Sequence, residues 1–97
     1  MSTIYFVSRH PGAQDWTQAE GVKVDRVVKH LDAGQVESGD VVIGTLPVNV
    51  AAAVCAQGAR YFHLSLTLPE NMRGQELTTA QMRRYGAKLV EYWVEKR

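Results

Sequence analysis

Residues 3–12 read TIYFVSRHPG, and this stretch decides the fold class. Its first five residues are all β-branched or aromatic, a pattern typical of a strand that is buried on both faces of a parallel sheet. Ser8, Arg9 and His10 then interrupt the apolar run, and Pro11 follows at a place that suits the first turn of a helix. The stretch therefore predicts a strand that leads through three polar residues directly into a helix.

The residues after Pro11 predict a helix and then a second strand. One apolar stripe is formed by Ala13, Trp16 and Ala19, and Gly21 ends it. Residues 22–31, VKVDRVVKHL, fit helical spacing, but their valine density favours a strand, and we predict a strand over residues 25–30. Residues 32–40, DAGQVESGD, predict a turn-rich connector.

The second half of the chain repeats the alternation of strand and helix. Residues 41–45 predict a short buried strand, Pro47 opens a helix that Gly58 closes, and residues 60–66 alternate as a strand. After a polar loop over residues 67–76, Thr78 and Gln81 have capping-box spacing. The last predicted helix carries on one face Met82, Tyr85, Leu89, Tyr92 and Trp93. The order β-α-β-β-α-β-α predicts an α/β fold, a small, mostly parallel sheet flanked by helices, in a single domain over residues 1–97.

Composition narrows the class of protein. The 97 residues are 45% hydrophobic with a single cysteine, Cys55, which allows a core but no disulfide within the chain and suits a cytoplasmic protein. No apolar run reaches the length of a membrane span, and no signal peptide is expected. A net charge of +1 argues against binding to long nucleic acid but leaves room for a small anionic ligand. No metal or cofactor is predicted.

Three segments with polar side chains follow the predicted strands. Ser8, Arg9 and His10 follow the first strand, and Ser65 and Thr67 follow RYFHL at residues 60–64. The segment after the strand over residues 41–45 adds Thr45, Leu46, Pro47 and Asn49. In parallel sheets ligands bind outside the carboxyl ends of the strands, and helix N-termini favour phosphate there. Because a guanidinium suits phosphate oxygens and an imidazole moves protons near neutral pH, we expect a phosphate-bearing ligand.

Structural readings of the same residues stay open. Ser8 can cap the first helix, and His10 can pack at the sheet edge. His63 can be a satisfied core or edge histidine, and Asn49 can bond only to a neighbouring loop. Arg73 can be either a ligand contact or a solvated loop charge.

A resemblance to a known family extends over nearly the whole chain. It is carried by the strings YFVSRHPGA at residues 5–13, VDRVVKHLD at residues 24–32, GDVVIGTLPVNVAAAVCAQGARYFHLSL at residues 39–66 and MRRYGAKLVEY at residues 82–92. The chain resembles a small CRISPR-associated Csx-type family, the sixteenth of its series, encoded beside type III CRISPR systems. The resemblance implies a Rossmann-like, CARF-like fold and a homodimer that binds cyclic oligoadenylate across its two-fold axis. It also implies a ring nuclease that cleaves this second messenger, cyclic tetra-adenylate in particular, and so switches off the antiviral response.

The residues and the resemblance predict a compatible chemistry. RNA-like linkages contain their own nucleophile, the 2′-hydroxyl, so that cleavage to a 2′,3′-cyclic phosphate needs positioning and proton transfer rather than a metal. We predict Ser8, Arg9 and His10 as catalytic residues, and as substrate-binding residues Thr45, Leu46, Pro47, Asn49, Ser65 and Arg73. The alternatives are a module that binds the messenger without cleaving it and a histidine-phosphatase-like phosphohydrolase, because Arg9-His10 precedes Pro11-Gly12.

Overall fold

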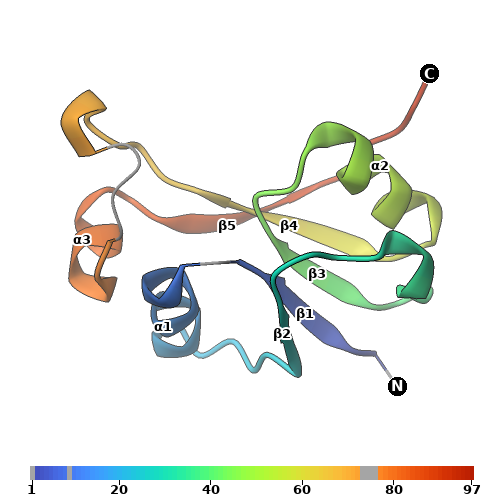
Figure 1. Ribbon diagram of the computed structural model, residues 1–97, viewed down its shortest axis with the longest axis horizontal. Coiled ribbons are helices and arrows are strands. Elements are labelled where there is room, and N and C mark those ends of the chain that lie inside the picture. The colour runs from blue at the N-terminus through green and yellow to red at the C-terminus, as the bar shows by residue number, and fades with distance from the viewer. Residues whose placement is uncertain (1, 9, 73–76) are drawn as a thin grey trace.

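A computed structural model describes residues 2–8, 10–72 and 77–97. Within these residues five strands form one sheet in the order β2-β1-β3-β4-β5 (Figure 1). The strands are β1 (Ile4–Val7), β2 (Arg26–Val28), β3 (Val41–Gly44), β4 (Arg60–Ser65) and β5 (Lys88–Tyr92). The first four strands run parallel to one another, and β5 is antiparallel to β4. The predicted mixed α/β fold with a mostly parallel sheet is confirmed.

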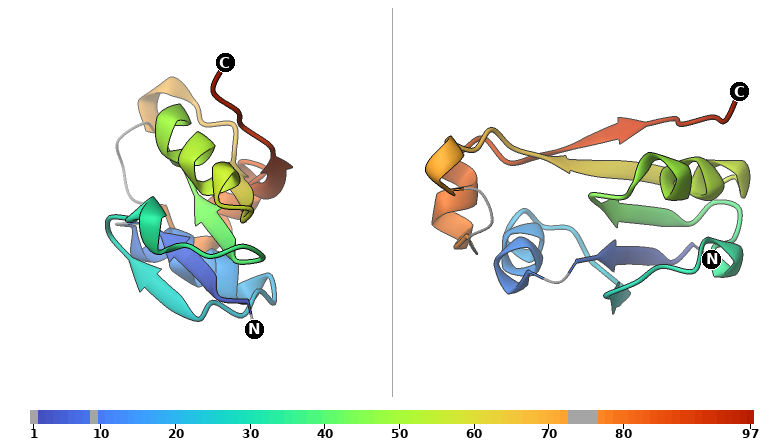
Figure 2. Two further views of the ribbon diagram at one scale, coloured as in Figure 1. Left: turned by 90° about the vertical axis from the view of Figure 1, so that its right-hand side faces the viewer. Right: turned by 45° about the horizontal axis from the view of Figure 1, so that its top comes forward.

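Helices cover both faces of the sheet, and consecutive residues of β1 pack against opposite faces. Tyr5 packs on the face that α2 (Val48–Ala56) and the 3₁₀ turn Ala33–Gln35 cover. Phe6 packs on the other face with α1 (Pro11–Ala19) and α3 (Thr79–Arg84). Figures 1 and 2 show α1 and α3 side by side at one end of the molecule, while α2 lies over the opposite half.

The order of the strands creates a switch point between β1 and β3. The chain passes from β1 through α1 to β2 on one side, and then returns across β1 to form β3 on its other side. From β3 it continues outward through α2 to β4. The helices that follow β1 and β3 therefore diverge to opposite faces, and the carboxyl ends of these two strands form a crevice where ligands bind in open α/β sheets.

The buried Asp40 side chain forms hydrogen bonds at the amino ends of β1 and β3, opposite to the switch point. It accepts hydrogen bonds from the backbone N–H groups of Thr3 and Glu37, each at 2.9 Å. These two bonds, with that of Thr3 contributing most, hold the pKa of the carboxyl below its usual value. The carboxylate thus joins the start of β1 to the turn before β3.

The prediction of one long last helix is wrong beyond Arg84. The capping box of Thr78 and Gln81 is present, but α3 ends at Arg84, and Gly86 has a φ of 74° that breaks the helix. The chain then forms β5, so that Leu89 and Tyr92 belong to a strand rather than to a helix face. Tyr92 and Trp93 are 48% and 67% exposed and are not part of the core.

Smaller differences concern the boundaries of elements. The strand expected over residues 25–30 is limited to Arg26–Val28, and the loop over residues 67–76 contains a 3₁₀ turn at Glu70–Met72. Ala19 is exposed, and Thr17 is buried instead, where its hydroxyl donates to the carbonyl of Ala13 at 2.8 Å. In the described part of the chain no helix has the length and apolar character needed to cross a bilayer.

Candidate functional site

A cavity of about 370 Å³ opens at the switch point between β1 and β3, and we call it the polar cavity because serine, threonine, histidine and lysine side chains line it beside apolar ones. Ser8 and His10 line it from the end of β1, and Thr45, Leu46 and Pro47 line it from the end of β3. Sequence reasoning placed these five residues in one site, and the fold brings them together.

Two residues of this polar cavity escaped the sequence analysis. Lys29 and His30 follow β2 directly and line the cavity from a third strand end. The predicted strand over residues 25–30 had enclosed both side chains within a strand. Their position after the last valine of a parallel strand, Val28, was the available sequence feature.

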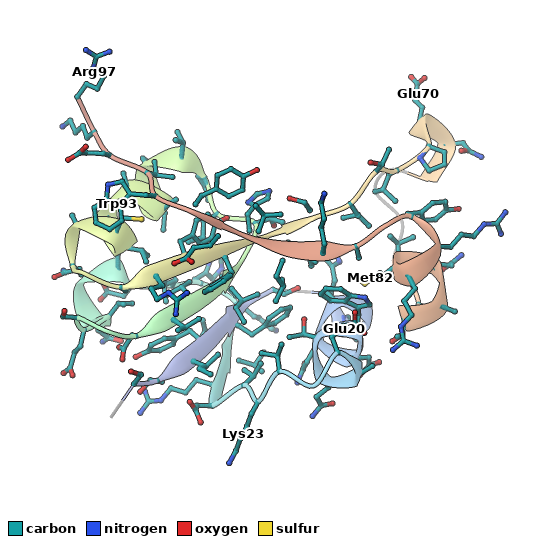
Figure 3. The ribbon with its side chains drawn as sticks, turned by 180° about the vertical axis from the view of Figure 1, so that it is seen from behind. Glu20, Lys23, Glu70, Met82, Trp93 and Arg97 are labelled. Atoms are coloured by element: carbon teal, nitrogen blue, oxygen red, sulfur yellow. The ribbon has the colours of Figure 1, made fainter. Side chains whose placement is uncertain are left out.

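An apolar cavity of about 210 Å³ adjoins the polar one. The two share Val7, Ser8, His10 and Thr45. The remaining walls of the apolar cavity come from β1, α1, β4, α3 and the neighbouring loops: Phe6, Ala13, Gly44, Leu64, Leu66, Leu68, Leu77 and Met82. Figure 3 shows Met82 on α3, at the end of the molecule opposite to Trp93. A polar and an apolar cavity with a common wall suit a ligand that has both characters.

The turn between β1 and α1 is held by Ser8. The Ser8 backbone N–H donates to the carbonyl of Val28 at 3.1 Å, which extends the pairing of β1 with β2 by one residue. The Ser8 hydroxyl oxygen accepts from the backbone N–H of His10 at 3.0 Å. His10 is exposed and is the N-cap residue of α1, without a side-chain hydrogen bond to the first turn. Ser8 therefore shapes the turn that presents the His10 imidazole and does not cap the helix itself.

The turn between β3 and α2 is held by Tyr61 of β4. Its hydroxyl accepts from the N–H of Leu46 at 2.9 Å and donates to the carbonyl of Gly44 at 3.2 Å, so that it bonds to the backbone on both sides of Thr45. Burial raises the pKa of this hydroxyl, which favours its neutral, donating form. Thr45, which lines both cavities, is positioned by these bonds.

Gly44 allows the ends of β1 and β3 to approach closely. A Cβ atom at this position would lie 2.7 Å from the carbonyl oxygen of Val7 and 3.3 Å from the Val7 Cβ. The absence of a side chain at Gly44 therefore sets the separation of the two turns that form the site.

Other predicted site residues lie elsewhere. Asn49 lines a separate groove with Trp93, beside the C-terminal segment. Ser65 pairs with Lys88 in the sheet and lines neither cavity. Arg9 and Arg73 lie outside the described residues.

The polar cavity suits an anion. Lys29 is a cation, His10 and His30 contribute imidazole nitrogens, and among the described residues no aspartate or glutamate belongs to the lining. The N-terminus of α2 adds partial positive charge beside Pro47 and Val50. Over residues 2–8, 10–72 and 77–97 no group of three or more histidine, cysteine, aspartate or glutamate side chains is arranged to hold a metal ion.

Comparison with known proteins identifies one family. Residues 5–95 match the model of the family described as "Putative CRISPR-associated protein (Cas_VVA1548)". No curated protein and no solved structure was found to match the chain.

Proposed function

The chain belongs to this CRISPR-associated family, and we propose that it is a metal-independent ring nuclease that cleaves cyclic oligoadenylate, cyclic tetra-adenylate in particular. The observation that carries the proposal is the pair of adjoining cavities at the β1–β3 switch point. The polar cavity, with the Lys29 ammonium in its wall, suits a phosphate of the ring, and the apolar cavity suits an adenine base attached through its ribose.

The proposed reaction uses the 2′-hydroxyl of the substrate as nucleophile. The 2′-oxygen attacks the adjacent phosphorus, the bond from phosphorus to the 5′-oxygen breaks, and a 2′,3′-cyclic phosphate and a 5′-hydroxyl result. Because the nucleophile already belongs to the substrate, holding the 2′-oxygen, phosphorus and 5′-oxygen in line contributes only part of the effect of full proximity, on the order of several kcal/mol. The turns that Ser8 and Tyr61 hold supply the rigidity for such alignment.

His10 and Lys29 have different roles in this reaction. The His10 imidazole takes the proton from the 2′-hydroxyl or returns one to the 5′-oxygen, which contributes roughly 10²–10⁴ in rate. The Lys29 ammonium and the helix N-terminus stabilise the negative charge that develops on the phosphoryl oxygens. Arg9, next to His10 in the sequence, is the predicted guanidinium partner of the same phosphate.

A homodimer fits a ring with four phosphates. Two copies of the site related by a two-fold axis would face equivalent linkages on opposite sides of cyclic tetra-adenylate.

A binding module without cleavage is the second candidate, and one observation favours it. A catalytic base is commonly oriented by a third group, but within the described residues no side chain is hydrogen-bonded to the His10 ring. Such a protein would sequester the messenger and lower its free concentration.

The deciding experiment is chromatography of cyclic oligoadenylates of different ring sizes after incubation with the protein, with and without EDTA. We expect linear products in molar excess over protein, unchanged by EDTA. Intact ligand retained by excess protein identifies the binding module, and complete loss of cleavage in EDTA contradicts the metal-independent reaction.

Two variants and a control locate the site. We expect His10→Ala to slow cleavage roughly 10²–10⁴-fold with a smaller effect on binding, and Lys29→Ala to weaken binding about tenfold through loss of a charged contact. Lys23→Ala removes the same charge from the loop between α1 and β2 (Figure 3) and should behave as wild type. Wild-type cleavage by both site variants would place the reaction elsewhere.

A further inference from the structure

Tyr61 and His63 form a hydrogen-bonded pair that the proposed reaction does not use. They lie two residues apart on β4 and therefore point to the same face of the sheet, the one that α2 covers. The Tyr61 hydroxyl oxygen lies 2.6 Å from Nδ1 of His63. In the sheet, His63 lies in register with Gly44 of β3 and Val90 of β5.

The contacts of Tyr61 assign the proton on His63. A tyrosine hydroxyl has one proton to donate and two lone pairs to accept with. It accepts from the N–H of Leu46 and is within donating distance of the carbonyl of Gly44, so all three contacts are hydrogen bonds together only if His63 donates from Nδ1. If Tyr61 donated to His63 instead, its oxygen would face the Gly44 carbonyl oxygen with no proton between them. The neutral imidazole then carries its proton on Nδ1 and a bare lone pair on Nε2.

His63 lines a pocket of about 220 Å³ on the face of the sheet that α2 covers. Its other walls are apolar or aromatic: Leu46, Val48, Ala51, Tyr61, Tyr92 and Val94. The rings of His63 and Tyr92 meet edge to face with 5.9 Å between their centroids. Within the described residues nothing is hydrogen-bonded to Nε2 of His63. This His63 pocket therefore offers a mostly apolar surface and, at Nε2 of His63, a hydrogen-bond acceptor.

The His63 pocket and the polar cavity lie on either side of the first turn of α2. Leu46 lines both, Val50 faces the polar cavity, and Val48 faces the His63 pocket. Together with the apolar cavity they provide an apolar, a polar and a second apolar compartment, and each shares at least one lining residue with the next. The order of the three compartments matches the order of a base, a phosphate and the next base in an oligonucleotide.

We propose that the His63 pocket binds an adenine base of the cyclic ligand, and that Nε2 of His63 accepts a hydrogen bond from the 6-amino group. This inference rests on the proposed function and names the residue that selects the base. A 6-oxo purine presents an acceptor at that position, so its oxygen would face the Nε2 lone pair without a proton between them. The His63 pocket therefore selects adenine against hypoxanthine.

Binding of cyclic tetra-adenylate and of its inosine counterpart, cyclic tetra-inosinate, by calorimetry tests the inference. We expect the wild-type protein to favour the adenine ring by roughly 3–10-fold for each base that occupies a His63 pocket. His63→Phe keeps a ring of similar shape and should abolish this preference while binding of the phosphates persists. Tyr85→Phe, at the end of α3 and outside all three compartments, should keep the preference.

Nitrogen-15 NMR of the histidine side chains tests the proton assignment without any ligand. We expect the Nδ1–H form of His63 in the wild type and loss of this bias in Tyr61→Phe. An Nε2–H form in the wild type, or equal affinity for the two rings, overturns the inference and leaves the proposed function intact. If neither ring binds, the proposed function fails as well.

Discussion

Gly44→Ala is a substitution that tests the position of the site without removing any of its side chains. The new methyl group would lie 2.7 Å from the Val7 carbonyl oxygen, closer than real Cβ contacts allow. Because the obstructing atom belongs to the backbone, it cannot rotate away. The ends of β1 and β3 must therefore separate by about 0.3 Å or more, and the turns that carry His10 and Thr45 move with them.

Two opposing effects set the change in unfolding free energy that we expect for Gly44→Ala. Overpacking of this kind typically costs about 1–3 kcal/mol of unfolding free energy. Alanine also restricts the unfolded chain, which returns about 0.4–1 kcal/mol. We expect a net loss of about 1–2 kcal/mol. Misplacement of reacting groups by about 1 Å can lower a rate about 100-fold, so a shift of a few tenths of an ångström should lower cleavage of cyclic tetra-adenylate about tenfold.

Urea denaturation and chromatography of the cleavage products measure the two effects separately. The matched control is Gly34→Ala in the 3₁₀ turn Ala33–Gln35, where the nearest atom to a new Cβ is the Asp32 side-chain oxygen at 3.2 Å. That variant should cleave at the wild-type rate. If Gly44→Ala loses stability as expected but also cleaves at the wild-type rate, the reaction does not take place at the β1–β3 switch point.

Two further predictions concern stability. Asp40→Asn should lower the unfolding free energy by about 1.5–3 kcal/mol at pH 7, because the charged acceptor for Thr3 and Glu37 is lost. Since the folded state depresses the pKa of Asp40, this contribution is complete above the unfolded pKa of about 3.9 and disappears as the pH falls through the lower folded value. Denaturation at several pH values checks this prediction. An equal loss of unfolding free energy at pH 7 and in strong acid would contradict it. Asp15 is exposed, and Asp15→Asn as the control should show little change. Thr78→Ala removes the capping box of α3 and should cost about 1 kcal/mol in the same assay, and an unchanged midpoint would show that α3 contributes nothing to the transition.

Half of the candidate site could be predicted from the sequence because of a general property of parallel sheets. Ser8, His10, Thr45, Leu46 and Pro47 each follow a recognisable buried strand, and parallel strands bring their carboxyl ends to one edge. The cavity or groove that each side chain at a helix start lines could not be predicted. Asn49 is only two residues beyond Pro47, but its position on the first turn of α2 directs its side chain to another groove.

The role of His63 could not be derived from its sequence context. A histidine in an alternating strand has a known face but an unknown partner. Its bond to Tyr61 could be anticipated from their spacing of two residues, but the bonds of Tyr61 to Gly44 and Leu46 depend on the pairing of β3 with β4. The proton assignment on His63 needs all three contacts together.

The sequence by itself determined the alternation of strands and helices, since buried parallel strands, proline at helix starts and glycine after helix ends are all local features. Tertiary structure alone decided the strand order and the fate of the C-terminal segment. Leu89 and Tyr92 are three residues apart, which places them on one face of a helix but on opposite faces of a strand, and propensity differs little between the two. The exposed edge of β4 resolves the choice, because its unpaired backbone groups form hydrogen bonds only when residues 88–92 lie extended beside it.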